Sequence, residues 1–475
     1  MRVKPAMSMD DRRLLEALLR TELIFFTRKV FAELHPGRTF TENWHQEAMA
    51  YWLHVTAVTG EIKRLVVNVP PRSLKSIMIS VALSAYLLGR DPTKKIIVVS
   101  YNQDLAADFS RKTRQVMQSI WYRQLFPSTR IVGKGAEGAF YTTQGGFRLA
   151  TSVEGTLTGR GGDLIILDDP QKAVDAYSEV RRESLYQWVT ETLFTRLDDK
   201  TSGVMILVQQ RLHVDDLSGQ LLQSKGWAHL SLPAIATADE RFCLGRSPLR
   251  FHNRCRGDLL DPSREPQHIL DGLKREMGTA PFLAQYQQDP MPPDGDVIKL
   301  GWFKRYSVPP AGECIFSVDT ASKAGLRNDY SVISVWVVAD GQFYLVYVWR
   351  RRVEYPELKK TLVAFYDEFR PGKILIEDKG SGIGLIQDLR TEQRYFPIQA
   401  YDPGGNSKEI RMRIQSAKIE QGHVHLPAEA PWLEAFTDEV RRFPNGSHDD
   451  QIDAMSQFLD SMNNRSLLII GSYRS

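Results

Sequence analysis

Apolar residues in the first half of the chain follow two spacings, one typical of helices and one typical of buried strands. Apolar positions three and four residues apart predict a helix in the first ~35 residues and a second helix at 44–59. Short apolar runs bounded by turn residues predict buried strands at 64–69, 95–100, 163–167 and 203–208. Helical stretches separate these runs at 75–88, 102–119 and 178–197. Strands that alternate with helices indicate a parallel sheet covered by helices, which we expect over residues 1–231.

Residues 232–305 differ from the segments on either side. Proline, arginine and glycine are frequent here, and the regular alternation of strand and helix patterns stops. Domain boundaries often fall in segments of this composition. We therefore predict a lid and linker that ends the first domain.

A second pattern begins near residue 306. Apolar runs predict three strands at 314–318, 331–338 and 343–349, and the turn at Asp340-Gly341 suits a hairpin between the last two. Further elements follow as a helix at 355–369, a strand at 373–377, a helix at 383–394 and a strand at 396–401. Antiparallel strands followed by helix-covered parallel strands are the order of a ribonuclease H-like domain. We expect such a mixed-sheet domain over 306–475.

Composition narrows the class of protein only a little. A chain of 475 residues is long enough for two or about three domains. Hydrophobic residues make up 42% and charged residues 25%, which excludes a disordered, collagenous or disulfide-scaffold protein. The net charge of +4 does not by itself indicate a nucleic-acid partner, but it permits basic patches beside acidic clusters.

The cysteines and the apolar runs bear on the compartment. Three cysteines, Cys243, Cys255 and Cys314, are too few for a disulfide framework and favour a reducing environment. A zinc site with His252 lacks a fourth ligand and close cysteine spacing. No apolar run reaches the ~18 residues of a membrane span, and no secretory signal is visible. We expect a soluble, intracellular protein.

A strand, a tight loop and a helix start at 66–76 suggest a phosphate-binding loop. In such a loop, backbone N–H groups and the helix dipole face the anion, Lys75 reaches the β- and γ-phosphates, and Ser76 holds Mg²⁺. The usual pattern has glycines where this chain has Val69 and Leu74. An ordinary strand-to-helix turn with an exposed lysine is the alternative.

A second acidic element supports the phosphate-loop interpretation. The apolar run 164–167 ends in Asp168 and Asp169. A strand end can place Asp168 on Mg²⁺ and Asp169 beside the water that attacks the γ-phosphate. This run follows the Lys-Ser pair by roughly 90 residues, a combination that makes a strand with a merely solvated acidic end the weaker interpretation.

Other polar residues are candidates for nucleotide chemistry. The glycine-rich stretch 155–163 brings backbone close to a neighbour, and its Arg160 offers a charge to a phosphate. Gln46 is a candidate for reading the adenine edge, although an amphipathic helix that carries a tryptophan is more often simply core. Three residues at the tip of the 203–208 strand are candidates for sensing the γ-phosphate and coupling hydrolysis to motion: Gln209, Gln210 and Arg211.

The second domain carries acids at three separate strand and helix ends. Asp319 ends the first strand, Glu377 ends the fourth, and a predicted helix opens with Asp449, Asp450 and Asp453. Asp450 and Asp453 share a helix face. Acids so arranged fit a two-metal nuclease site, with ions about 3.5–4 Å apart. For each acid alone, a helix cap or a solvated charge is the alternative.

Three further residues bear on the nuclease site. Lys379 and Lys408 lie in loops near the acids or just before a helix, and they are candidates for contacting DNA phosphates. Asp329 is a candidate outer carboxylate. The sequence leaves open which of the three helix aspartates points inward.

Several motifs occur in an order that resembles one protein family. They are W-H-Q, P-P-R-S-L-K-S, G-T-L-T-G-R-G-G-D, L-D-D-P, Q-Q-R-L-H-V-D-D-L and A-Q-Y-Q-Q-D-P. Together they resemble the large terminase subunit of tailed bacteriophages, the motor that packages DNA, over about residues 20–460. The resemblance implies an N-terminal P-loop ATPase domain of the RecA/ASCE type and a C-terminal ribonuclease H-like nuclease domain.

The resemblance also assigns roles to residues. It implies that Lys75 and Ser76 bind ATP, that Arg72 contacts phosphate, and that Ser73 belongs to the same ATP-binding loop. Asp168 then binds Mg²⁺, and Asp169 stands where many members have a catalytic glutamate. Arg160 resembles the arginine finger of the family. The metal ligands implied in the nuclease are Asp319, Glu377 and Asp450 or Asp453.

On this basis we expect ATP-driven translocation of double-stranded DNA into a capsid, and cutting of concatemeric DNA with Mg²⁺ or Mn²⁺. The resemblance also implies a small terminase subunit, a portal ring, a homo-oligomeric ring of this chain and a location in the host cytoplasm. Two alternatives remain: a host or prophage helicase or repair nuclease, and an inactive prophage relic.

Overall fold

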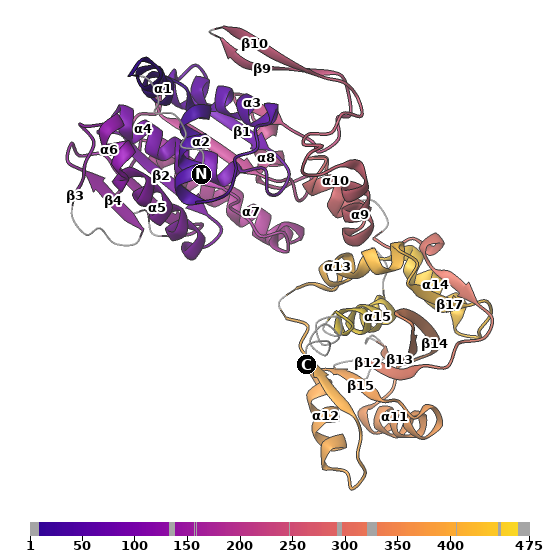
Figure 1. Cartoon of the computed structure of the whole chain (residues 1–475). Helices are drawn as coiled ribbons and strands as arrows, with labels where there is room; N and C mark the ends of the chain where they lie inside the picture. Colours follow the sequence, from indigo (N-terminus) through magenta and orange to yellow (C-terminus); the bar gives the residue numbers. More distant parts are fainter. Residues whose placement is uncertain are drawn as a thin grey trace. The chain divides into compact units, whose positions relative to one another are not determined.

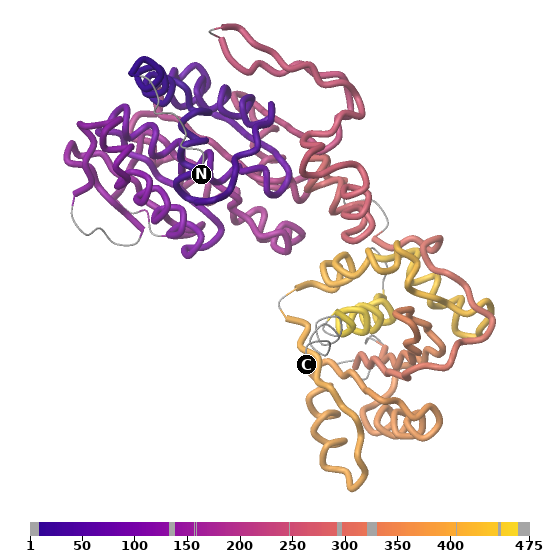
Figure 2. The backbone as a smooth tube through the Cα atoms, in the orientation of Figure 1, coloured from indigo at the N-terminus to yellow at the C-terminus, as the bar shows by residue number. Residues whose placement is uncertain are grey.

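The structure, a computed structural model, describes residues 9–132, 138–155, 157, 159–246, 248–291, 297–320, 330–404, 406–444 and 448–463. It has two compact units, and Figure 2 traces the chain from the first, coloured indigo to magenta, into the second, in orange and yellow. The first comprises Met1–Asp271 and Ala280–Pro293, and the second comprises Gly272–Thr279 and Asp294–Ser475. The segment 232–305 is therefore divided between the two units. No helix within the described ranges combines the length and apolar character needed to cross a bilayer.

The first unit is built on an eight-stranded sheet in the order β3-β4-β5-β2-β6-β7-β1-β8. Strands from β5 to β8 in this order run parallel, and β3 and β4 join as antiparallel strands. The strands are β1 Arg64–Asn68, β2 Lys95–Ser100, β3 Ile131–Val132, β4 Ala139–Thr142, β5 Phe147–Ser152, β6 Leu164–Asp168, β7 Val204–Gln209 and β8 Ala228–Ser231. The central strands are fully buried, as their apolar runs predict.

Helices cover both faces of this sheet, and each face has its own apolar core. One face packs against α1 Met9–Thr21, α2 Leu23–Leu34, α3 Trp44–Leu53, the π-helix η2 Ile77–Leu83, α4 Ser84–Arg90, α5 Gln103–Gln118 and α6 Ile120–Leu125. The other packs against α7 Glu179–Gln187, the π-helix η4 Trp188–Leu193 and α8 Leu217–Gln223. The single N-terminal helix that we predicted is two helices, because Glu22 has an extended backbone.

Two strands and two helices follow β8 along the chain. β9 Glu240–Arg246 and β10 Leu249–Arg254 form an antiparallel ribbon (Figure 1). The ribbon packs against α3, where Trp44 stacks on His252. Beyond it lie α9 Gln267–Met277 and α10 Thr279–Gln285. The sequence pattern did not predict the ribbon, since its residues are mostly half-exposed and carry no continuous apolar run.

The second unit contains a seven-stranded mixed sheet in the order β11-β17-β14-β13-β12-β15-β16. The strands are β11 Lys304–Tyr306, β12 Glu313–Asp319, β13 Ser331–Ala339, β14 Gln342–Arg351, β15 Lys373–Glu377, β16 Ile398–Tyr401 and β17 Val424–Pro427. Antiparallel β12, β13 and β14 are followed by parallel β15 and β16. This confirms the predicted ribonuclease H-like order, and the fold class of both units is as expected.

Helices cover the two faces of the second sheet as well (Figure 1). The core on one face includes α11 Tyr355–Phe369 and α12 Ser381–Thr391. The core on the other face includes α13 Lys408–Glu420, α14 Leu433–Arg442 and α15 Asp450–Ser461. Nearly every residue of α15 is buried, and this helix packs on β12 and β13. The acidic start of α15 is thereby brought to the end of the first strand.

Candidate nucleotide and metal sites

The loop between β1 and η2 has the backbone of a phosphate-binding loop at the position where a glycine is missing. Leu74 has φ 59° and Arg72 has φ 64°, both in the left-handed region. Glycine adopts this region without steric strain, whereas another residue pays about 1–2 kcal/mol. Leu74 therefore stands in a conformation that suits glycine, which is the residue that the usual motif has there. The leucine changes the strain of the loop but leaves its backbone shape in place.

The residues predicted to bind ATP meet the two strand-end acids. The Lys75 ammonium lies 2.8 Å from Asp169 Oδ1. The Ser76 hydroxyl donates a hydrogen bond of 3.0 Å to Asp168 Oδ1. Lys75 is 6% exposed, whereas the Asp169 side chain is partly exposed to water. In this state Asp169 supplies the negative charge that a nucleotide phosphate would offer to Lys75.

Asp168 is enclosed by side chains that the sequence analysis did not select. The Ser80 hydroxyl donates a hydrogen bond of 2.6 Å to Asp168 Oδ2, one helical turn beyond Ser76. Burial, followed by the charge of Asp169, raises the pKa of Asp168 to about 6. A hydroxyl pair on one carboxylate fixes its orientation, as a ligand for a hard cation requires.

Arg148 of β5 is a buried cation behind this carboxylate. Its Nη2 donates to the Ser80 carbonyl at 3.2 Å, while Nε and Nη1 lack hydrogen-bond partners among the described residues. Burial lowers the pKa of Arg148 to about 9, and the charge of Asp168 acts in the opposite direction. An arginine between the apolar Phe147 and Leu149 was the sequence signal for this residue.

The other predicted nucleotide residues lie in different surroundings. Gln46 is buried on α3, and its amide donates to the Thr41 carbonyl at 3.2 Å. In the loop, Ser73 is buried and Arg72 is exposed, with the Arg72 carbonyl accepting a hydrogen bond from Arg264. Arg160 is exposed in its glycine-rich loop.

The three candidate coupling residues differ in their burial and in their hydrogen-bond partners. Gln209 ends β7, is 2% exposed, and lies directly opposite Asn68 of β1. Gln210 follows it and is partly exposed. Arg211 is held inside its own turn, because its Nε lies 3.0 Å from both carboxylate oxygens of the buried Asp216. The guanidinium also donates to the carbonyls of residues 213 and 214, so Arg211 shapes this turn.

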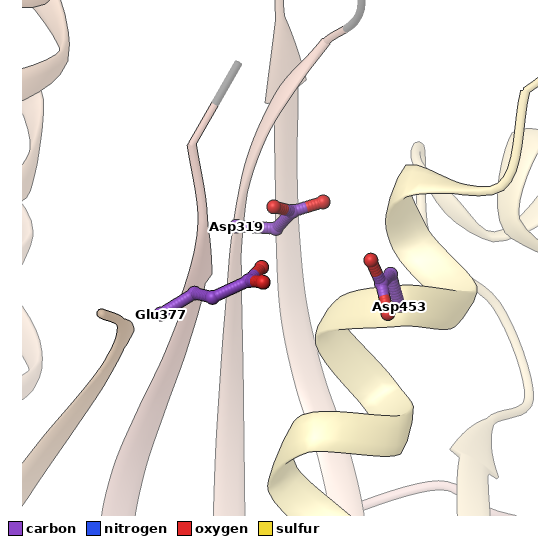
Figure 3. A group of neighbouring side chains, drawn as sticks. All are labelled: Asp319, Glu377 and Asp453. Atoms are coloured by element: carbon purple, nitrogen blue, oxygen red, sulfur yellow. The ribbon is translucent and has the colours of Figure 1, made fainter. Parts of the chain in front are cut away.

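The second unit brings three acids together from three elements. Asp319 and Glu377 end adjacent parallel strands, in which Val318 lies opposite Ile376. Asp453 lies on the first turn of α15, and Figure 3 shows the three carboxylates turned toward one another. One oxygen from each carboxylate lies within 4.8 Å of the others. This geometry suits a hard divalent cation such as Mg²⁺ or Mn²⁺, which prefers oxygen ligands.

The carboxylates of the acid group repel one another, and the nearby cations offset only part of that repulsion. Burial, then the charge of Asp453, raises the pKa of Asp319 well above its usual range. The same two causes raise the pKa of Glu377. Like charges this close favour proton or cation uptake. The donor set therefore fits a metal site better than a structural ion pair.

Two cations of α13 contact the same acids. The Lys408 ammonium lies 2.9 Å from Asp449 Oδ1 and 3.3 Å from Asp453 Oδ2. Arg411 Nη2 lies 2.5 Å from Asp453 Oδ1. Burial opposes the charge of Lys408, but the nearby carboxylates, Asp453 first, raise its pKa overall. Lys408, which we predicted to contact DNA phosphates, therefore lies against the acid group itself, and Arg411 does so as well.

The helix aspartates have separate partners. Asp453 belongs to the acid group, whereas Asp450 Oδ2 lies 3.6 Å from Arg350 Nη2. Asp449 contacts Lys408. The structure thus places Asp453, of the two alternatives, with Asp319 and Glu377, and a direct metal role for Asp450 stays a prediction.

Two candidates remain. Lys379 is exposed, and its ammonium donates to the Gly404 carbonyl at 2.9 Å. Asp329 lies outside the described residues.

Comparison with known proteins agrees with both units. Residues 316–462 match the family model described as the terminase RNaseH-like domain. The fold is similar to the large terminase of a thermophilic bacteriophage in complex with ADP, with a TM-score of 0.51, 12% identity, and coverage of 89% of this chain and 100% of that one. A second structure of the same phage terminase, in complex with ATP-gamma-S, has a TM-score of 0.51, 12% identity and coverage of 89% and 98%.

The large terminase of bacteriophage HK97 is also similar, with a TM-score of 0.37, 11% identity, and coverage of 86% of this chain and 90% of that one. No curated protein matches the sequence.

Proposed function

We propose that this chain, which resembles the large terminase subunit of tailed bacteriophages, is the ATP-driven motor and nuclease that packages the DNA of such a phage. One observation carries the proposal: a phosphate-loop site and a three-carboxylate site occur on one chain, each in its own unit. Packaging of a concatemeric genome requires a nuclease that cuts the DNA and an ATPase that translocates it, and this chain carries a candidate site for each.

The first site has the parts of an ATPase. Lys75 would exchange its contact with Asp169 for the β- and γ-phosphates, which leaves Asp169 able to orient the attacking water. Ser76 and Asp168 would hold Mg²⁺, with Ser80 fixing the second oxygen of Asp168. The large terminase of the thermophilic bacteriophage, which shares this fold, is described in complex with ADP and with ATP-gamma-S. By analogy, we propose that the loop between β1 and η2 of this chain binds a nucleotide.

The second site has the parts of a metal-dependent nuclease. Asp319, Glu377 and Asp453 would hold divalent ions, which supply an activated water and stabilise the leaving 3′ oxygen. Lys408 and Arg411 now compensate the charge of Asp453, and they would move or share their contacts as the ions bind. Matching residues 316–462 to the terminase domain supports DNA as the substrate.

The proposal includes the partners of a packaging motor. These are double-stranded DNA, a small terminase subunit that recognises sequence, a portal ring, and further copies of this chain, in the host cytoplasm. Exposed Arg160 would act on the nucleotide of a neighbouring copy. A helicase fits less well, because the second unit has the strand order of a nuclease in place of a second RecA-like sheet.

Two substitutions in the full-length protein test the proposal. Lys75→Ala removes the charge on the phosphates, and ATPase activity is expected to fall on the order of 10²-fold or more while Mg²⁺-dependent cutting persists. Asp319→Asn should abolish cutting while ATPase activity persists, because an amide is a poor ligand for a hard cation. The measurements are phosphate release and cleavage of linear DNA, each with and without EDTA.

Matched controls separate these effects from general damage. Lys200→Ala removes an exposed lysine of the first unit, and Asp340→Asn changes an aspartate in the β13–β14 turn; both should behave as wild type. Normal ATPase activity in Lys75→Ala would remove the phosphate-loop assignment. Undiminished cutting in EDTA would remove the nuclease assignment.

A further inference from the structure

An aromatic ring is stacked between two arginines at the edge of the carboxylate site. The Cζ of Arg350 lies 3.8 Å from the centroid of the Tyr330 ring, and the Cζ of Arg352 lies 4.4 Å from it. His448 meets the same ring edge-on, with 5.2 Å between centroids. We call these four residues the Tyr330 stack.

Strand register places the stack beside the metal site. Asp319 of β12 lies opposite Val332 of β13, and Val332 lies opposite Arg350 of β14. Directly opposed residues share a face of the sheet, so Arg350 is on the face of Asp319. Two strand spacings separate them by about 10 Å. Arg352 directly follows β14, and its guanidinium lies over the same Tyr330 ring as that of Arg350, whereas Arg351 between them is on the other face of the sheet.

The two arginines differ in whether an acidic side chain already balances their charge. Arg350 lies 3.5 Å from Glu439 and 3.6 Å from Asp450, and its charge is balanced by these buried acids. Arg352 is exposed, and no acid within the described ranges forms an ion pair with it. Among the cations beside the acid group, Lys408 and Arg411 are engaged by aspartates. Arg352 therefore has a charge available for an outside anion.

A DNA strand needs such a cation at this place. Three carboxylates repel the phosphates on either side of the bond to be cut, and a nearby guanidinium offsets that repulsion. The contact with the Tyr330 ring restrains the guanidinium of Arg352 before any ligand binds, which reduces the entropy lost on binding. Arg350, which contacts the same ring, lies about 10 Å from Asp319, so the stack is within reach of the strand whose bond is cut at the carboxylates.

We propose that the Tyr330 stack binds a backbone phosphate of the strand being cut, close to the scissile bond. In this arrangement Arg352 makes the phosphate contact. Tyr330 orders Arg352, and Arg350 ties the stack to the start of α15 through Asp450. The inference rests on the proposed nuclease function, and it adds the surface along which the substrate strand lies.

The test measures DNA cleavage and DNA binding by the full-length protein at several salt concentrations. Arg352→Ala should raise the half-saturating DNA concentration roughly 10-fold with kcat within about twofold, and should reduce the salt slope by about one. Arg352→Lys should keep the salt slope but recover only part of the affinity, because the flat stack is lost. Tyr330→Leu should weaken binding with the salt slope unchanged.

Arg351→Ala is the matched control, because it removes an exposed arginine one position away on the opposite face. Equal binding and equal salt slopes for Arg351→Ala and Arg352→Ala would overturn the proposal, as would a loss confined to kcat. Binding is also measured by fluorescence anisotropy with Ca²⁺ in place of Mg²⁺. If wild type cuts no DNA, the nuclease function fails, and the anisotropy comparison still decides whether Arg352 binds phosphate.

Discussion

At the scale of single residues, three left-handed backbones lie in or directly beside the first candidate site. Leu74 and Arg72 hold left-handed backbones in the phosphate loop, and Asp169 does so at φ 43° directly after β6. Each is a conformation that a side chain normally avoids. Strain of this kind persists where the surrounding structure determines the backbone, and it is common at ligand-binding positions.

The left-handed backbone of Leu74 predicts that glycine is more stabilising than alanine at this position, the reverse of their usual order in a helix. Leu74→Gly and Leu74→Ala lose the same packing, but only glycine relieves the left-handed strain, so Leu74→Gly should be more stable by about 1 kcal/mol. At Leu14, an exposed position inside α1, glycine should be less stable than alanine by about 1 kcal/mol. Urea unfolding of the four variants measures both differences. Alanine being the better residue at both positions would contradict the left-handed loop.

At the scale of elements, the first site depends on how β5, β6 and η2 fit together. Ser76 and Ser80, one turn apart around the start of η2, hold the two oxygens of Asp168. Arg148 of β5 reaches the Ser80 carbonyl from the sheet. π-helical segments are frequent at functional sites, and here one presents a carbonyl to a side chain of the sheet.

Arg148 and Asp168 should therefore be energetically coupled. Arg148→Met removes a buried charge that interacts with Asp168 through space and takes away the hydrogen bond to the Ser80 carbonyl, and the expected loss is about 1–3 kcal/mol of unfolding free energy. Adding Asp168→Asn to Arg148→Met should cost less than the sum of the single changes, because neither charge is then left alone. Urea unfolding without nucleotide gives the coupling. Simple additivity within about 0.5 kcal/mol would show that the two charges do not interact.

At the scale of the whole molecule, the boundary between the units determines which fragments can fold. We predicted a nuclease domain that starts near residue 306, but the second unit includes residues from Asp294. Val297, Ile298 and Phe303 are 4%, 2% and 6% exposed and belong to the core that contains α15. Burying such side chains contributes roughly 1.5–3 kcal/mol each.

A fragment of residues 294–475 should therefore be more stable than one of residues 306–475. The three lost side chains amount to roughly 5 kcal/mol or more, enough to unfold a domain of ordinary stability. Urea unfolding and Mn²⁺ binding by calorimetry compare the two fragments. If the shorter fragment is equally stable and binds metal equally well, the segment 294–305 is not part of the nuclease core.

The central strands of both sheets and most of the acids of the candidate sites could be predicted from the sequence. Apolar runs separated by helical periods predicted the parallel sheet, and the order of strands 314–318, 331–338 and 343–349 predicted the ribonuclease H-like sheet. Because parallel strands end at one edge of a sheet, the sequence also indicated that Asp319 and Glu377 lie together. These predictions depend on the spacing of apolar residues and on the order of the strands along the chain, and both can be read directly from the sequence.

Only the tertiary structure decided which side chains meet across elements. Asp450 and Asp453 share a helix face, so periodicity cannot choose between them; the packing of α15 on β12 places Asp453 with the acid group and Asp450 with Arg350. Lys408 was expected to face DNA, yet α13 places it on the aspartates of α15. Arg148 reaches the Ser80 carbonyl beside Asp168 through the sheet order β5-β2-β6 and the π-helix on it. Contacts of this kind depend on how distant elements are packed in space, and no local pattern in the sequence contains that information.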